Sequence, residues 1–504
     1  MKYRLLVALA ISSLLLPALA QSQALTSLSS LRVRYNSLKV RTQPAGELKT
    51  QLDLLDAELA DAARLGQTGE SRRLLAKGNV LLAGNTWTDA VDYANSLVLR
   101  SDRVVVDPAD RYTVRLEQIY QPAIAISNAL NARATLNSAG AGQQAAMVVK
   151  DFGQFTGVSR DLRESPYFLD LDLADVADGN YQLHVEVVAD TQVIGASNLL
   201  ITVRQGLNAL VAKLEQGAGS AAAEIRADIL YPVDRMRQVN RGKLELRTFN
   251  PAEDFAAAEA VLTASAAGTN PFIGRSGDFK RHYLLESANE IMPYRMYVPS
   301  SYDPSRGAPL IVALHGLGGT ENSFFENYEA DFPRLAEQHG YIVAAPLGFR
   351  VDGSYGWGLG NAPVDPTVQF VQARSEEDVM QVLELARAHY NIDPDRIYLA
   401  GHSMGAIGTW KVAAKFPDVW AAIGMFAGAG TPATLSQMQH IPQYVVHGDA
   451  DPTVNVEGSR TMVARMKELE MTVQYTEVPG GNHGDVVAPG FPGLFEFFNS
   501  YTKK

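Results

Sequence analysis

The chain has 504 residues, of which 46% are apolar and 20% charged, and its formal net charge is −11. This length is sufficient for roughly two to four domains, and the acidic balance excludes the overall basic surface by which proteins bind nucleic acids or anionic membranes. The sequence contains no cysteine, which excludes disulfide bonds, cysteine-ligated zinc and a cysteine nucleophile.

The N-terminus has the pattern of a secretory signal peptide. A basic segment at residues 1–4 precedes an apolar run at 5–16, and residues 18–20, Ala-Leu-Ala, form a cleavage pattern of small residues. The run is shorter than the about 20 residues that a membrane-spanning helix requires. We expect cleavage after Ala20 or after Ala24, and a secreted or periplasmic protein without a membrane anchor.

Three regions of different composition follow. Apolar residues recur at helical spacing between residues 21 and 84, with a break at Pro44-Ala45-Gly46, which predicts a helical hairpin. Residues 85–205 contain short β-rich segments separated by turns, which is typical of a β-sandwich. Residues 206–270 are Ala-rich and helical in composition, and we expect them to form a helical connector.

The acidic run from Asp170 to Asp178 lacks the ligand spacing of a calcium-binding loop. Its first aspartates alternate with leucines, and this alternation predicts the solvated face of a strand that is followed by a turn. We found no cluster with metal-ligand spacing elsewhere in the sequence. The sequence therefore predicts no metal and no other cofactor.

Residues 271–504 have a different sequence pattern, in which short apolar runs bounded by Gly and Pro alternate with helical stretches. Examples of the apolar runs are residues 309–314, 341–345 and 396–400. Near-continuous apolar strands that alternate with helices are typical of a parallel sheet covered on both faces. We therefore predict an α/β domain here.

Residues 401–405, Gly-His-Ser-Met-Gly, match the pattern G-x-S-x-G. A nucleophilic serine at a sharp turn from strand to helix needs flanking glycines, because the strand and the helix approach closely there. The required context is present, since an apolar run precedes the motif and a helical segment begins at Ile407. We predict that Ser403 is a catalytic nucleophile.

A serine nucleophile needs a base and an acid, and in this arrangement they follow in the order Ser, Asp or Glu, His. Of the histidines after Ser403, only His483 follows a plausible acid loop, and it lies just past the predicted strand 473–478. In the loop 447–454 both Asp449 and Asp451 qualify as the acid by composition. Loops with the pattern H-G-x-x-D usually direct the second aspartate to the histidine, which favours Asp451.

Acyl transfer also needs hydrogen-bond donors for the developing oxyanion, each worth roughly 3–4 kcal/mol. The Gly-rich segment 315–319 follows the predicted strand 310–314. We expect the backbone N–H groups of Leu317 and Met404 to be these donors. We expect His315 to support the loop by hydrogen bonding.

Residues 272–504 resemble α/β-hydrolases of the group that contains feruloyl and acetyl-xylan esterases, polyhydroxybutyrate depolymerases and prolyl-oligopeptidase-like peptidases. The resemblance lies in residues 314–319, 393–405, 408–410, 447–451 and 482–483. It implies an α/β-hydrolase fold and a secreted, cofactor-independent serine carboxylesterase. Secreted depolymerases of the group often carry Cys at the position of Leu317, and this departure disfavours polyester hydrolysis.

The substrate is predicted less sharply than the reaction. Residues 348–361 form a long segment in which Tyr355 and Trp357 lie among glycines, and we expect these aromatic residues to form a wall of the substrate site. Packing within their own loop is the alternative. We expect an ester substrate, with polysaccharide-linked acyl or aryl esters as one class. The alternatives are a prolyl-oligopeptidase-like peptidase, a polyester depolymerase and an inactive binding protein. No oligomeric state is predicted.

Overall fold

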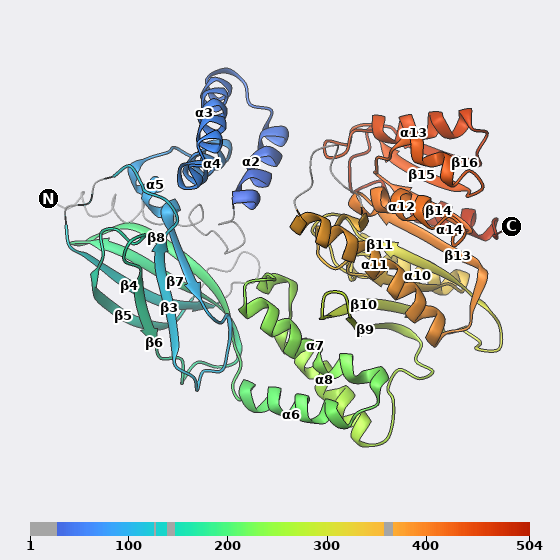
Figure 1. Ribbon diagram of the computed structural model, residues 1–504, viewed down its shortest axis with the longest axis horizontal. Coiled ribbons are helices and arrows are strands. Elements are labelled where there is room, and N and C mark those ends of the chain that lie inside the picture. The colour runs from blue at the N-terminus through green and yellow to red at the C-terminus, as the bar shows by residue number, and fades with distance from the viewer. Residues whose placement is uncertain (1–27, 125, 127, 139–146, 357–365, 504) are drawn as a thin grey trace. The chain divides into compact units, whose positions relative to one another are not determined.

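The computed structural model describes residues 28–124, 126, 128–138, 147–356 and 366–503. The chain divides into two compact units (Figure 1). The first contains the chain up to residue 216 and residues 232–257, and the second contains residues 217–231 and 258–504. The helices between residues 206 and 270, which we expected to form one connector, are therefore divided between the two units.

In the described part of the first unit, three helices come first where the sequence predicted a hairpin of two: α2 (Leu28–Thr42), α3 (Gly46–Arg64) and α4 (Thr68–Leu82). Gly66 lies between α3 and α4 with a φ of 67°, a left-handed conformation that glycine adopts without steric cost and that reverses the chain. The leucines of the three helices form one buried cluster. The break at Gly66 explains why the apolar spacing alone did not reveal the third helix.

Two β-sheets follow in the first unit. The strands of one sheet are β1 (Leu97–Ser101), β3 (Tyr112–Gln118) and β6 (Tyr167–Leu171), which follow α5 (Asp89–Ser96) in the chain. The strands of the other, in spatial order, are β2 (Val105–Val106), β8 (Gln192–Val203), β7 (Gly179–Ala189), β4 (Leu130–Ser138) and β5 (Val148–Val158). Buried and partly exposed residues alternate along β3 and β7, as expected when each sheet has one buried face.

The acidic run lies at the surface of these sheets. Asp170 in β6 is exposed and accepts hydrogen bonds from Arg111 and Thr113, whereas the neighbouring Leu169 and Leu171 are buried. Within the described parts of the chain, no group of three or more metal-ligating side chains could hold an ion.

Four further helical segments follow the sheets: α6 (Leu207–Ser220), α7 (Ala223–Asn240), the 3-10 helix η3 (Leu246–Thr248) and α8 (Pro251–Ala266). The part of α7 that belongs to the second unit is tied to β9 of that unit. Asp228 forms a buried ion pair with Arg281 at 3.1 Å and accepts the backbone N–H of His282 at 2.8 Å. This segment of α7 is thus part of the core of the second unit.

The second unit is built on an eight-stranded sheet in the order β16-β15-β14-β13-β11-β12-β10-β9. The first two strands of the unit in chain order, β9 (Gly277–Leu285) and β10 (Glu290–Val298), form an antiparallel pair at one edge. The other six are parallel: β11 (Ala308–Leu314), β12 (Ile342–Pro346), β13 (Ile392–His402), β14 (Ala422–Phe426), β15 (Gln443–Gly448) and β16 (Val473–Val478). This is an architecture of the α/β-hydrolase type.

Helices cover both faces of this sheet (Figure 1). On one face α10 (Asp331–His339) and α14 (Val487–Asn499) pack together, and the aromatic side chains of α14 belong to a buried core cluster with strand residues such as Val446. On the other face lie α11 (Pro366–His389), α12 (Met404–Lys415) and α13 (Glu457–Glu468). Short helical turns complete the unit: α9 (Ser323–Glu326), η4 (Tyr328–Ala330), η5 (Ser354–Gly356) and η6 (Pro432–Gln437).

None of the helices in the described parts of the chain is long and apolar enough to cross a membrane. The predicted signal peptide, residues 1–20, lies outside the described residues and stays a prediction.

Candidate active site

Ser403 lies at the turn between β13 and α12, at the carboxyl end of a central strand. Its φ of 55° and ψ of −118° are a strained conformation for a residue with a side chain, as expected where a nucleophile is presented on a sharp turn. Its backbone N–H donates to the carbonyl of Phe426 on the neighbouring strand at 2.9 Å. The turn is therefore anchored to the sheet while the hydroxyl points out of it.

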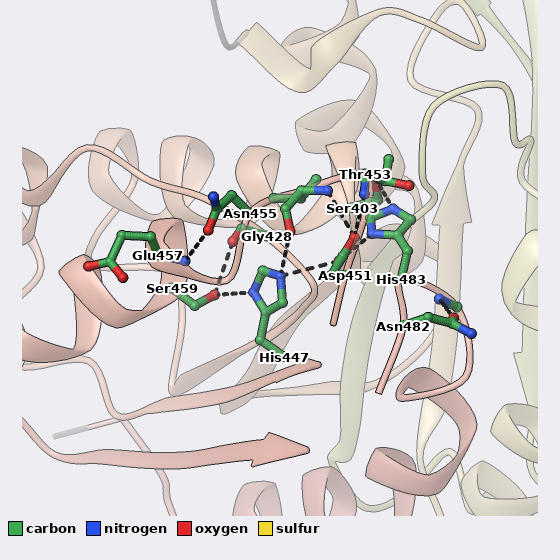
Figure 2. A network of polar contacts seen from close by, with 12 residues as sticks. Ser403, Gly428, His447, Asp451, Thr453, Asn455, Glu457, Ser459, Asn482 and His483 are labelled. Carbon is green, nitrogen blue, oxygen red and sulfur yellow. Dashed lines mark hydrogen bonds and ion pairs between the residues drawn. The ribbon is translucent and has the colours of Figure 1, made fainter. Parts of the chain in front are cut away.

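The structure brings Ser403, His483 and Asp451 together from three loops at this edge of the sheet (Figure 2). The Oγ of Ser403 lies 2.8 Å from Nε2 of His483, and Nδ1 of His483 lies 2.7 Å from Oδ2 of Asp451. An ionised carboxylate only accepts hydrogen bonds, so Nδ1 carries a proton and Nε2 of the neutral ring accepts the proton of the serine hydroxyl. These are the contacts that general-base activation of a serine requires.

The side chain of Asp451 is completely buried, whereas the side chain of His483 is 19% exposed. Burial alone would raise the pKa of Asp451. Hydrogen bonds from His483 and from the backbone N–H groups of Val454 and Thr453 outweigh this effect and hold the pKa of Asp451 below its usual value. Asp451 therefore stays ionised at neutral pH and can stabilise a positive charge on His483.

Asp449, the other candidate acid, has a different partner. Its Oδ1 accepts the backbone N–H of Gly480 at 2.6 Å, which joins the loop after β15 to the loop that carries His483. The other two histidines that follow Ser403 have other partners: His440 is exposed and contacts the carbonyl of Pro417, and the buried His447 lies 3.2 Å from Oδ2 of Asp451.

The Gly-rich segment after β11 lies against the nucleophile. A side chain at Gly316 would lie 3.3 Å from the Cβ of Ser403, so the backbone passes directly beside the reacting hydroxyl. His315 supports this segment, as expected, with Nε2 2.6 Å from the carbonyl of Leu347 and Nδ1 2.7 Å from that of Gly316. Burial lowers the pKa of His315, although both carbonyls favour its protonated form.

Residues 286–483 match the model of the Esterase family, described as "Putative esterase". We refer to residues 286–483 as the esterase region. Feruloyl esterase B of Neurospora crassa is 32% identical over 168 residues, which cover 30% of this chain and 54% of that protein. Poly(3-hydroxyalkanoate) depolymerase C of Paucimonas lemoignei is 34% identical over 136 residues, covering 26% of this chain and 30% of that protein.

A bifunctional acetylxylan esterase/xylanase of Neocallimastix patriciarum is 26% identical over 162 residues, which cover 32% of this chain and 22% of that protein. The chain thus spans about half or less of the length of these curated relatives. Among solved structures, a ferulic acid esterase from Anaeromyces mucronatus has a TM-score of 0.37 and 18% identity, covering 46% of this chain and 93% of that chain.

Tyr355 of the esterase region does not line the substrate site, contrary to our expectation. It is fully buried beneath the site, with its hydroxyl 3.4 Å from the carbonyl of His315 and its ring against Gly348 and Gly408. The absence of side chains at Gly348 and Gly408 leaves a space that the ring of Tyr355 fills. From there the hydroxyl of Tyr355 contacts the loop that bears His315. Trp357, the other residue of the expected aromatic wall, lies outside the described residues.

The two backbone N–H groups that we expected to bind the oxyanion, those of Leu317 and Met404, both lie close to Ser403 in the chain or in space. Met404 is the first residue of α12, where a backbone N–H has no acceptor within the helix. Leu317 follows Gly316 in the segment beside Ser403, and its side chain is 66% exposed. Their role in binding an oxyanion stays a prediction.

Sequence reasoning missed two residues of the esterase region: His402, which contacts the loop that carries His483, and Tyr328, which contacts His402. Nε2 of His402 lies 3.0 Å from the carbonyl of His483, and its Nδ1 lies 2.8 Å from the hydroxyl of Tyr328. Burial, together with the nearby imidazole of His483, lowers the pKa of His402 to about 4. The ring is therefore neutral at neutral pH, with its one proton on the nitrogen that faces the carbonyl of His483. The sequence did offer one indication of a role for His402, because this residue directly precedes the proposed nucleophile Ser403.

Proposed function

We propose that this protein is a serine carboxylesterase in which Ser403 is the nucleophile, His483 the general base and Asp451 the acid that orients it. The observation that carries the proposal is the continuous pair of contacts from Ser403 through His483 to Asp451, at 2.8 and 2.7 Å. The match of this region to the Esterase family supports the reaction type. No cofactor takes part in the proposed reaction.

In the proposed reaction the Oγ of Ser403 attacks the ester carbonyl while Nε2 of His483 takes the hydroxyl proton. The tetrahedral oxyanion accepts hydrogen bonds from the N–H groups of Leu317 and Met404. His483 returns the proton to the alcohol as the C–O bond breaks, which leaves an acyl-enzyme on Ser403. A water molecule, deprotonated by His483, then releases the acid and restores the serine.

We propose an ester substrate in which the acyl or aryl group is linked to a polysaccharide. The names of the curated relatives, feruloyl esterase and acetylxylan esterase, support this class. The likeness to a poly(3-hydroxyalkanoate) depolymerase supports polyester as the second candidate. We also propose that the signal-peptide pattern at residues 1–20 directs the protein to the periplasm or the exterior, where such polymers are met.

A fluorophosphonate probe and an ester panel test the reaction together. The full-length protein is expected to be labelled once and to hydrolyse short-chain aryl esters, and Ser403→Ala is expected to abolish both without unfolding the protein, because it removes the attacking oxygen and adds no bulk. Ser436→Ala, at an exposed serine, is the matched control and should change neither. Wild-type hydrolysis by folded Ser403→Ala would refute the mechanism.

The same panel ranks the substrate classes. Hydroxycinnamate esters, acetylated xylan, a polyhydroxyalkanoate film and peptide amides are compared by kcat/KM. Faster cleavage of peptides than of esters would favour a peptidase, and faster cleavage of the film would favour a depolymerase. Activity lost with EDTA and restored by a metal would contradict the proposed cofactor-free reaction.

A further inference from the structure

Asp451 lies between two imidazoles (Figure 2). His483 approaches Oδ2 from one side at 2.7 Å, and His447 approaches the same oxygen from the other side, with its Nε2 at 3.2 Å. His447 lies in β15, four residues before Asp451, and its side chain is completely buried. The proposed reaction does not use His447, so its contact with the acid needs a separate explanation.

The neighbours of His447 determine where its proton lies. Its Nε2 is 3.0 Å from the carbonyl oxygen of Val454 and 3.2 Å from the carboxylate of Asp451, and both atoms only accept hydrogen bonds. Nε2 must therefore carry a proton. If Nε2 carried no proton, its lone pair would face the lone pairs of two buried acceptors, and none of these atoms would be hydrogen-bonded to another.

The other ring nitrogen is held by α13. Nδ1 of His447 lies 2.7 Å from the Oγ of Ser459, and that Oγ lies 3.0 Å from the carbonyl of Gly428. Ser459 is also completely buried. The ring is thus fixed from both sides, by α13 at Nδ1 and by the acid loop at Nε2, and it cannot rotate away from Asp451.

We propose that His447 is a positioning residue: its Nε2–H donates to the carbonyl of Val454 beside Oδ2 of Asp451, and it thereby holds the acid loop and its carboxylate in the orientation that His483 needs. The inference rests on the proposed serine esterase reaction. A carboxylate has about four lone-pair sites. Thr453 and Val454 donate to Oδ1 through their backbone N–H groups, His483 contacts Oδ2 at 2.7 Å, and Nε2 of His447 lies 3.2 Å from the same oxygen. Both oxygens of the carboxylate are thus held, and Val454, which donates to Oδ1, is itself held by the Nε2–H of His447.

Two substitutions at His447 separate the N–H donor from the volume of the side chain. His447→Leu removes the donor and is expected to lower kcat about 3- to 10-fold, the usual range for one lost hydrogen bond. KM should change less than about twofold, because His447 does not face the substrate side. His447→Gln can present an amide N–H near the position of Nε2 and should restore most of kcat.

A double-substitution cycle tests whether His447 acts through the acid. In the Asp451→Asn background, His447→Leu should cause no further loss in the rate of fluorophosphonate labelling, because the charge that it orients is already absent. Val446→Ala, a cavity in the same strand on the opposite face of the sheet, is the control for lost stability and should leave kcat unchanged. All variants are compared in the full-length protein after thermal unfolding confirms their fold.

Equal kcat values in His447→Leu and His447→Gln, whether both normal or both low, would overturn the inference, and so would additive losses in the cycle. If His447→Leu does not fold, Ser459→Ala replaces it, since freeing Nδ1 should lower kcat about 3- to 10-fold, and an unchanged kcat would overturn the inference. Failure of the proposed function is distinguishable, because the unsubstituted protein would then lack Ser403-dependent hydrolysis altogether.

Discussion

At the scale of single residues, two aspartates in one loop have separate environments. Asp451 contacts His483 and is buried, whereas Asp449 accepts a backbone N–H from Gly480. We expect Asp451→Asn to lower kcat by several orders of magnitude, ~10⁴ in the protease precedent, because the amide favours the wrong tautomer of His483. Asp449→Asn should alter kcat little and stability by about 1 kcal/mol or less. Steady-state kinetics on folded variants test this, and the reverse ranking would reassign the acid.

His402 predicts a specific pH dependence of stability. Its pKa is about 4 in the folded protein, below the ordinary value of 6.5, so the unfolded chain binds this proton more readily between those values. The stabilising contribution is complete above about pH 6.5 and is lost as the pH falls towards 4. Compared with His402→Gln, the native protein should lose up to about 1.4 kcal/mol of unfolding free energy more per pH unit in this window. Urea unfolding from pH 4.5 to 7.5 measures the difference, and parallel curves would contradict the prediction.

At the scale of elements, the turn from β13 to α12 depends on close backbone approach. A Cβ at Gly405 would overlap the carbonyl of Leu314 in β11, and a Cβ at Gly401 would overlap the carbonyl of Gly405. Because these obstacles are backbone atoms, they cannot move aside as a flexible side chain can. The strand, the turn and the helix therefore form one unit that presents Ser403.

We accordingly expect Gly405→Ala to destabilise the protein by at least about 2 kcal/mol, in the range of overpacked cores, and to lower the rate of fluorophosphonate labelling. Gly219→Ala in α6 is the matched control, since a Cβ there meets no atom within 4 Å. It should be neutral or slightly stabilising, because alanine is the better helix former. Thermal unfolding compares the two, and equal stabilities would show that the turn tolerates a side chain.

At the scale of the whole molecule, the second unit extends beyond the region that the sequence pattern marks as the α/β domain. Asp228 from α7 forms a buried ion pair with Arg281 of β9, and both side chains are at most 5% exposed. Tyr231 also stacks on His282, with ring centroids 3.9 Å apart. Residues of α7 thus complete the edge of the eight-stranded sheet.

A fragment that begins at Asn270 would leave Arg281 buried without its carboxylate, which costs about 3–5 kcal/mol in comparable pairs. We expect this fragment to aggregate or to be poorly expressed. A fragment beginning at Gly217 retains Asp228 and is the matched comparison. Size-exclusion chromatography, thermal unfolding and short aryl ester hydrolysis compare both with the full chain. A monomeric 270–504 fragment with full stability and rate would contradict the prediction.

The sequence by itself determined those features that depend on contiguous residues. The Gly-His-Ser-Met-Gly turn and the apolar parallel strands such as β11 and β12 follow from local spacing and steric demand. The family match then agreed with the resemblance found in residues 272–504. Such signals are readable because the period of a strand or helix and the size of a glycine act within a few residues.

Only the tertiary structure decided which groups meet across the sheet. Tyr355 was expected to face the substrate, but the space left by Gly348 and Gly408 draws its ring into the core. His402 contacts the backbone of His483, 81 residues away in the chain, and His447 meets Asp451 because α13 holds its ring in place. These contacts arise from the packing of elements that are distant in sequence, and a one-dimensional pattern does not specify which side chain fills a space between such elements.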